Sequence, residues 1–200
     1  MQNQKYTATN TGRPFSFKAM IIGAKLKEDG YSDKEIREKS KNENIFQSRS
    51  EHQRIKTAST VNKRLNMLDE QLINKLINGD STTIKQIIIY SIMKSDRFFF
   101  EFMDEVYKDK IILREFIIKD SDINIFIKRK QEQIPQIAQW TELTLKKLKT
   151  QYLTMLQEAN FIKRINGAIE IIPPVIDPSL YNHLLEIGDE AYLQAMIGEI

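Results

Sequence analysis

The chain has 200 residues, of which 41% are hydrophobic and 28% are charged, so it can bury one core or two small ones. It contains no cysteine, which excludes disulfide scaffolds, thiolate zinc sites and cysteine nucleophiles. Its most apolar charge-free stretch, Gln86–Met93, is far shorter than the roughly 20 residues of a membrane helix. The start also lacks a signal-peptide pattern. These features predict a cytoplasmic protein that uses no metal, cofactor, membrane or small-molecule substrate.

Charge is distributed unevenly along the chain. Residues 1–65 carry 14 basic and 7 acidic side chains, and residues 128–165 carry 8 and 3. Residues 66–127 carry 8 and 11, whereas residues 166–200 carry no lysine or arginine and 6 acids. Basic fields attract polyanions, so the two basic blocks are candidates for binding nucleic acid. Patchy surface charge also arises without any function, and charge alone leaves both interpretations open.

Residues 1–68 predict an N-terminal helix-turn-helix region. The segment 14–29 has apolar groups at helical spacing, with Pro14 in the first turn. Ser32–Glu35 has the pattern of a capping box and starts a short second helix. Ser50 caps a third helix, which is longer and has apolar positions three and four residues apart.

Residues 69–119 predict a central apolar helical core. Thr83–Lys94 contains an isoleucine run that also fits a buried strand, but the length of the segment favours a helix. Asp96–Lys110 is rich in phenylalanine and is predicted as a further helix. Residues 111–119 are β-branched and aromatic, and neither state is favoured there.

Residues 120–176 predict a winged helix-turn-helix. Ser121 caps one helix of this region, and Thr141 caps a longer one. Asn166-Gly167 lies between two short apolar runs and gives the strongest short-range hairpin signal, which supplies the wing. Residues 177–200 predict an acidic helical tail. The fold class is therefore mainly α, with helical helix-turn-helix regions and a small β-hairpin wing near the C-terminus.

Two helices, at residues 50–65 and 142–159, are candidates for contacting a DNA duplex. Each carries basic and hydroxyl side chains on the face opposite its apolar residues, as a helix in the major groove requires. Any helix on the surface of a protein also carries lysines toward solvent. Each face by itself is therefore explained equally well by a surface helix that binds nothing. Their coincidence with the two basic blocks favours binding. The candidate DNA-binding residues are Arg49, Gln53, Lys56, Thr60, Lys63, Arg64, Thr141, Thr144, Lys146, Lys147, Lys149, Thr150, Lys163 and Arg164.

Motifs for catalysis are missing from the sequence. It has no P-loop, no G-x-G-x-x-G and no G-x-S-x-G, and no acid is followed two residues later by lysine as in many metal-dependent nucleases. Glu101, Asp104, Glu105 and Asp109 share one helical surface and offer oxygen ligands for Mg²⁺. The solvated face of a helix explains these acids better, since phenylalanines lie opposite. The sequence therefore predicts a protein that is not an enzyme.

Several weak motifs occur in an order and at a spacing that together resemble one known family. They are Tyr6 with Gly12–Phe17, Asn44-x-x-Gln47-x-Arg49-Ser50 leading to Arg64-Leu65, Asp80–Phe102, Thr144 to Leu156-x-x-Ala159, and Ile171-Ile172-Pro173. Over nearly the whole chain the sequence resembles the BrxA family, small proteins of the bacterial BREX phage-defence systems. The chain departs from the family at Lys18-Ala19, where an acid is usual, and at Asn160, which replaces a glycine and can also adopt the left-handed backbone expected there.

The resemblance implies a mainly helical DNA-binding accessory protein, without known enzymatic activity, whose partners are double-stranded DNA and other BREX proteins. Together with the basic faces, it predicts duplex binding mainly through phosphate contacts with little sequence preference. The alternative is a protein-interaction adaptor that organises a defence complex through its acidic tail and apolar patches. RNA binding is less favoured, because the aromatic residues inside the basic blocks, Tyr152 and Phe161, fit core positions.

Overall fold

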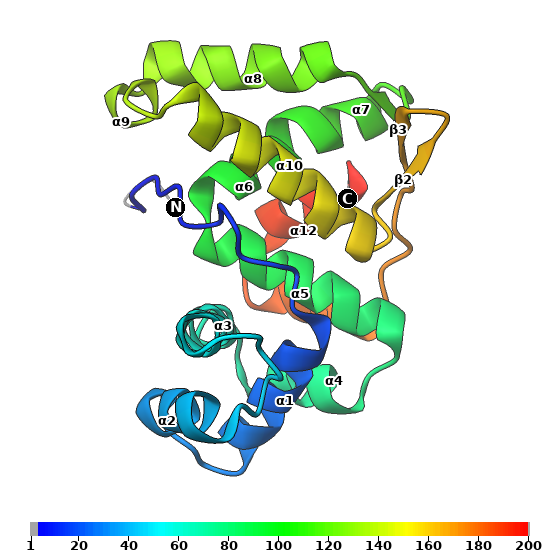
Figure 1. The fold of residues 1–200 in the computed structure, drawn as a ribbon. Coiled ribbons are helices and arrows are strands. Elements are labelled where there is room, and N and C mark those ends of the chain that lie inside the picture. The colour runs from blue at the N-terminus through cyan, green and yellow to red at the C-terminus, as the bar shows by residue number, and fades with distance from the viewer. Residues whose placement is uncertain (1–3, 200) are drawn as a thin grey trace. The chain divides into compact units, whose positions relative to one another are not determined.

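The computed structural model describes residues 4–199 and is mainly α with one small antiparallel sheet, as predicted (Figure 1). Backbone contacts divide the chain into two compact units. The first unit is residues 15–91, and the second unit joins residues 4–14 to residues 92–199. The finer division into four regions stays a prediction. None of the helices formed by the described residues is long and apolar enough to cross a bilayer.

The first unit is a group of packed helices. Their bounds are α1 Phe17–Glu28, α2 Asp33–Glu43, α3 Glu51–Leu65, α4 Glu70–Asn78 and α5 Ser81–Ser95, whose last turn belongs to the second unit. α1 packs against α3 and α4, and α2 packs along α3. Gly23 allows α1 to approach α3 closely, because a Cβ there would lie 2.4 Å from Val61 Cγ1. The predicted capping box of α2 is present: Ser32 and Glu35 each bond the other's backbone amide.

The first helix begins later than the sequence predicts. The prediction that Pro14 lies in its first turn is wrong, since α1 starts at Phe17, after Ser16 with a φ of 65°. Phe15 is 1% exposed, and its carbonyl accepts a hydrogen bond of 2.9 Å from Arg64 Nη1 of α3. Because this carbonyl is bonded to a side chain instead of a helical amide, the helical ladder begins only after it.

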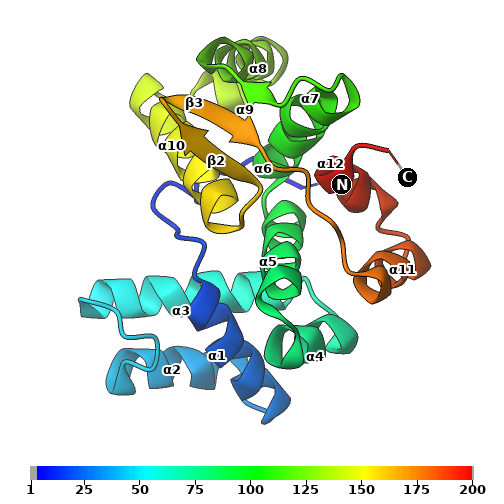
Figure 2. The same cartoon turned by 90° about the vertical axis from the view of Figure 1, so that its right-hand side faces the viewer.

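The second unit is built around three helical segments that follow one another directly. The bounds of its elements are α6 Arg97–Phe102, the π-helix η1 Met103–Tyr107, α7 Lys108–Ile112, β1 Ile117–Ile118, α8 Asp120–Gln133, α9 Pro135–Ala138, α10 Glu142–Glu158, β2 Ile162–Ile165, β3 Ala168–Ile171, α11 Pro178–Glu186 and α12 Glu190–Ile197. In Figure 2, α10 and the hairpin lie on one side of α6, and α11 and α12 lie on the other.

An aromatic cluster joins α6 to α8, to the turn after α9 and to α10. The ring centroids of Phe98 and Phe126 are 5.2 Å apart, and those of Phe99 and Tyr152 are 4.8 Å apart. Trp140 packs edge-on against Phe98, with 5.3 Å between centroids. Each such pair contributes about 0.5–1.5 kcal/mol beyond the area that it buries. The cluster therefore fixes the position of α10 in the second unit.

The predicted hairpin is present, and a third strand joins it. At its turn, Asn166 and Gly167 have φ values of 50° and 84°, so both adopt the left-handed backbone that a type I′ turn requires. β1 pairs with the other edge of β3, with Ile118 opposite Ile169, to give the order β1-β3-β2. The ambiguous residues 111–119 thus hold the end of α7, a turn and β1.

The helices on either side of α9 begin at caps of different kinds. α8 starts at Asp120, and the amide of Lys119 donates to Asp122 Oδ2 at 2.8 Å, so the prediction that Ser121 caps this helix is wrong. A carboxylate in the first turn is favoured over a hydroxyl because it also interacts with the helix dipole. Thr141 caps α10 as predicted, accepting from the amide of Thr144 at 3.2 Å.

The acidic C-terminal segment is part of the second unit. Leu180, Leu184, Leu193 and Met196 are buried, and α12 packs against η1 and α7. Most of the large apolar side chains of α11 and α12 are therefore covered by this unit, and Tyr181 and Leu185 are half-buried.

Candidate nucleic-acid interface

α10 presents a basic face to solvent. Leu145, Leu148 and Tyr152 are buried on its inner side, whereas Lys146 and Lys147 are exposed on its outer side. This alternation follows from the 3.6-residue period of the helix, since the inner positions recur at spacings of three and four.

Lys146 and Lys147 carry charges that no neighbour neutralises. Neither side chain forms an ion pair with any residue between 4 and 199. Lys149 differs, because its Nζ lies 3.0 Å from Asp120 Oδ1 and 3.5 Å from Asn124 Oδ1. Lys146 and Lys147 are therefore the cations of this helix that are available to an external anion.

Three grooves flank this face of α10. They lie toward α8, toward the hairpin and toward the N-terminal strap, which is residues 4–14, and have volumes of about 360, 570 and 510 Å³. Lys146, Lys149 and Thr150 each line two of the three grooves and so form the ridge between them. Lys128 lines the groove toward α8, and Arg164 lines the groove toward the hairpin. The structure thus brings basic residues of α8, α10 and the hairpin around one ridge.

The two cations of the hairpin differ in their surroundings. Lys163 Nζ lies 3.1 Å from Glu170 Oε1, since the register places Lys163 directly opposite Glu170 on β3. Arg164 is exposed and forms no ion pair within the described part of the chain. Arg164 is therefore the cation of the hairpin that is free to meet a phosphate.

Thr141 is the cap of α10, and Thr144 lies in its first turn. Their hydroxyl oxygens are 3.0 Å apart, and Thr141 Oγ1 also accepts from the amide of Thr144. Each hydroxyl has one hydrogen, so one of the two can donate outward only while it accepts from the other. Helix N-termini favour anions through their free amides and dipole, so this turn adds a weakly positive end to the basic ridge.

The candidate DNA-binding residues of α3 and the turn before it differ in how exposed they are. Arg49 and Gln53 are exposed beside its N-terminus, and Lys56 and Lys63 are half-buried farther along. Ser50 caps the helix by accepting from the amide of Gln53. The fully exposed candidates of this helix are therefore confined to its beginning.

The prediction that Thr60 and Arg64 face outward is wrong. Thr60 is 2% exposed and donates to the carbonyl of Lys56 at 2.8 Å, and Arg64 is 1% exposed and donates to Phe15. α1 and α2 both pack against α3, so its buried surface is wider than the single apolar stripe visible in the sequence. The long apolar stem of an arginine tolerates such burial when its guanidinium group is bonded.

Three of the four acids that the sequence offered as Mg²⁺ ligands are ion-paired. Lys130 Nζ lies 2.5 Å from both Glu101 Oε2 and Glu105 Oε1, and Lys108 contacts Asp104. Within residues 4–199, no group of three or more histidines and acids is arranged to hold a metal ion. The carboxylates of Glu101 and Glu105 stabilise the packing of α8 against the α6–η1 segment through Lys130.

Glu101 is the centre of this polar cluster. Burial opposes its ionisation, but hydrogen bonds from Lys130, Tyr6 and Arg97 outweigh burial and lower the pKa of Glu101. Burial, together with the hydrogen bond that its hydroxyl donates to Glu101, raises the pKa of Tyr6 well above its ordinary value. Glu101 is therefore ionised and Tyr6 neutral across the physiological range.

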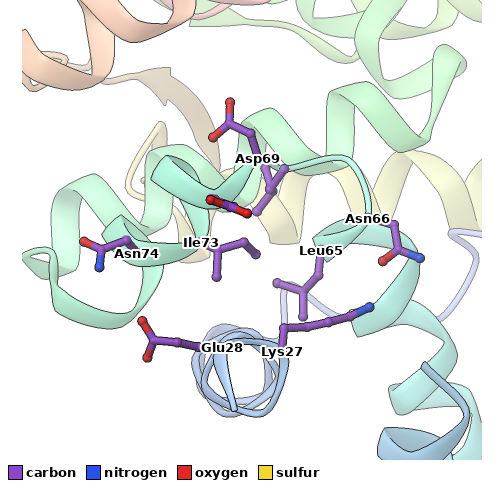
Figure 3. A pocket seen from close by; sticks show the side chains of 9 residues that line it. Lys27, Glu28, Leu65, Asn66, Asp69, Ile73 and Asn74 are labelled. Atoms are coloured by element: carbon purple, nitrogen blue, oxygen red, sulfur yellow. The ribbon is translucent and has the colours of Figure 1, made fainter. Parts of the chain in front are cut away.

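A cleft of about 730 Å³ in the first unit has a different character (Figure 3). Leu65 and Ile73 project into it, and Glu28, Asp69 and Glu70 are among the residues of its rim. The ammonium group of Lys27, which also lines the cleft, contacts Asp33 on α2. Acids outnumber bases here, so the cleft does not suit a polyanion.

Some residues around α10 were not among the sequence candidates. Lys128 is exposed and lines the groove toward α8. The run of three basic residues at 128–130 is the sequence signal that could have identified it. Leu143 is 61% exposed, although its apolar character predicts a buried position. Thr11 and Gly12 line a groove with α10 from more than a hundred residues away, and no local pattern signals that contact.

Comparisons with known proteins agree with this fold. A family model described as BrxA matches residues 4–188. The BREX protein BrxA of Bacillus cereus (strain H3081.97) is 39% identical over 199 residues, which covers 100% of both chains. The crystal structure of an uncharacterized protein from Magnetospirillum magneticum has a TM-score of 0.84 at 18% identity, covers 98% of this chain and all of that one, and shares its fold. The chain belongs to the BrxA family.

Proposed function

We propose that this chain is a non-catalytic accessory protein of a bacterial BREX anti-phage system that binds duplex DNA, mainly through phosphate contacts and with little sequence preference. The full-length relative named as a BREX protein supports the system. The observation that carries DNA binding is the exposed face of α10, where Lys146 and Lys147 have no carboxylate partner among the described residues.

The order of elements supports the same function. α7, β1, α8, α10 and the β2–β3 hairpin follow one another in the order of a winged helix-turn-helix, with β1 paired to β3. In that arrangement α10 takes the place of the helix that enters the major groove, and the hairpin takes the place of the wing. Lysine is a point charge that suits phosphate more than the bidentate contacts by which arginine, asparagine and glutamine read bases. Binding with little sequence preference follows.

The first unit offers a second and smaller contact. Arg49 and Gln53 at the start of α3, with the half-buried Lys56 and Lys63 behind them, are proposed to touch the DNA backbone. Thr60 and Arg64 are buried and are left out of this contact.

Charge reversal on α10 tests the proposal. The double variant Lys146→Glu and Lys147→Glu should weaken binding of a fluorescein-labelled duplex at least about tenfold at about 0.1 M salt, because two phosphate contacts become repulsive. The matched control is Lys18→Glu with Lys25→Glu, two exposed lysines of α1 whose reversal changes the net charge equally. Fluorescence anisotropy measures both affinities.

Equal effects of the two double variants would show that only net charge matters and would remove α10 from the interface. Failure of the unmodified protein to bind any duplex at low salt would remove DNA binding itself.

The adaptor function is a second candidate, favoured by one observation. Leu113 and Ile125 are 66% and 65% exposed and line one groove between α7 and α8. Exposed apolar side chains in one place are typical of protein–protein contacts. If the adaptor function holds, Leu113→Glu with Ile125→Glu should abolish co-purification with other proteins of the same BREX system and leave duplex binding intact. Retained co-purification would argue against it.

A further inference from the structure

We infer that the N-terminal strap, residues 4–14, forms with α10 a groove that binds the phosphodiester backbone, so that the strap is part of the DNA interface. This role rests on the proposed DNA binding and adds a contact outside the helix and the hairpin. The groove has a volume of about 510 Å³. Its walls are Thr11 and Gly12 on the strap and Leu143, Lys146, Lys147, Thr150 and Gln151 on α10.

The strap is held in place along its length. Tyr6 is 6% exposed, and its hydroxyl donates to Glu101 Oε1 at 2.7 Å. Gln136 Nε2 donates to the carbonyl of Tyr6 at 2.6 Å, and Asn10 donates to Asp96. These bonds connect the strap to α6 and to α9. The strap is therefore an ordered wall and not a loose terminus.

A single buried carboxylate links the two walls of the groove. Asp96 is 2% exposed and caps α6 by accepting from the amides of Phe98 and Phe99 at 3.0 and 3.2 Å. It also accepts from the hydroxyl of Tyr152 on α10 at 3.2 Å and from the side chain of Asn10 on the strap. Because one side chain bonds both α10 and the strap, their separation is fixed before any ligand binds. Preorganisation of this kind lowers the entropic cost of binding.

The charge of the groove suits a polyanion. Its lining residues include the ammonium groups of Lys146 and Lys147 and no carboxylate. By contrast, Glu142 lines the groove toward α8, and Asp120 lines the groove toward the hairpin. The groove beside the strap is thus the one of the three without an acid in its lining.

The strap also supplies hydrogen-bond donors of the kind that phosphate contacts use. The amides of Thr11 and Arg13 donate to the carbonyls of Ala8 and Asn10, at 3.2 and 3.1 Å. The amide of Gly12 between them meets no acceptor within residues 4–199. The hydroxyl of Thr11 donates to the carbonyl of Ala8 at 2.9 Å, so the amide of Gly12 is the donor that this part of the strap offers. Backbone amides donate to phosphate oxygens in many DNA complexes without reading sequence.

The wall that α10 forms also includes one apolar side chain. Leu143 is 61% exposed at the start of α10 and offers a surface for the sugar. Cations, a free amide and an apolar side chain together match a phosphodiester chain, which alternates charged phosphates with less polar sugars.

Substitutions at Thr11 test this role, since Thr11 lines the groove and belongs to neither α10 nor the hairpin. Thr11→Glu should weaken duplex binding about fivefold, and Thr11→Lys should tighten it by a similar factor, as expected for one unit charge about 4 Å from a phosphate in water. Thr11→Gln separates charge from side-chain length and should change binding little. Asn182→Glu and Asn182→Lys, at an exposed position of α11 in the same unit, are the matched controls.

All variants are compared as full-length chains by fluorescence anisotropy, with the unfolding midpoint recorded for each. The strap role is supported if Thr11→Glu weakens and Thr11→Lys tightens duplex binding, each by more than the same substitution at position 182. If the Thr11 and Asn182 series agree while Lys146→Glu with Lys147→Glu still weakens binding at least about tenfold, the strap role is wrong and the proposed function stands. Absence of duplex binding by the unmodified chain overturns both.

Discussion

At the scale of single residues, the basic side chains of this protein fall into two groups, those whose charge is bonded within the fold and those whose charge is not. Arg64 is buried and bonded to the carbonyl of Phe15, and Lys130 lies between Glu101 and Glu105. Such cations stabilise the fold and are not available to a ligand. Lys146, Lys147 and Arg164 have no ion-pair partner in the described chain and remain available for binding.

Replacing Arg64 should affect stability and not the interface. Arg64→Ala removes a buried side chain and leaves the carbonyl of Phe15 without its donor, which should lower the free energy of unfolding by about 2–4 kcal/mol. Urea unfolding measures the change. The exposed Arg49→Ala is the control and should stay within about 0.5 kcal/mol of the unmodified protein. A similar small effect at Arg64 would contradict its placement.

The pKa of Glu101 predicts how stability depends on pH. Because the pKa is lowered in the folded state, Glu101 contributes stability above its unfolded pKa, and that contribution is lost as the pH falls through the folded pKa. Glu101→Gln should therefore cost about 1–3 kcal/mol at neutral pH and much less at about pH 3. Denaturant unfolding at both pH values measures this. The exposed Glu132→Gln should show no such difference, and a pH-independent cost at Glu101 would count against an ionised cluster.

At the scale of secondary-structure elements, the hairpin shows how a pair of adjacent cations acquires different roles. The register places Lys163 opposite Glu170, whereas its neighbour Arg164 lies opposite Ile169, which has no charge to pair with it. Alternation along a strand produces this difference, since successive side chains face opposite sides of the sheet.

The two hairpin cations should therefore contribute differently to DNA binding. Arg164→Gln should reduce the slope of log K against log salt by about 0.9, the value for one phosphate contact. Lys163→Gln should reduce it less, because Glu170 already neutralises part of that charge. Titrations with duplex at several salt concentrations give both slopes. A larger effect at Lys163 would contradict the hairpin geometry.

Elements with strong local signals could be predicted from the sequence. Thr141 as a helix cap and Asn166-Gly167 as a turn were both correct, because each depends on chemistry within a few residues. β1 has only two residues, too few for a pattern, and becomes a strand because β3 offers it an edge. The burial of Arg64 was not predictable from α3 alone, since it depends on which helices pack around α3.

At the scale of the whole molecule, the feature that local patterns could not reveal is a contact between distant parts of the chain. Asn10 reaches Asp96, and Asp96 reaches Tyr152, so that the strap and α10 share one anchor in the second unit. The sequence identifies α10 as basic, but its second wall comes from residues that carry little charge. A candidate site read from charge alone is therefore incomplete.

The salt dependence of duplex binding tests the central claim, which is that the exposed cations around α10 bind DNA through phosphates. With about four to six phosphates neutralised, log K should fall with log salt at a slope between about −3.6 and −5.4. Lys146→Glu with Lys147→Glu should make this slope shallower by about 1.8. A slope near zero, or one that the double variant leaves unchanged, would contradict the claim.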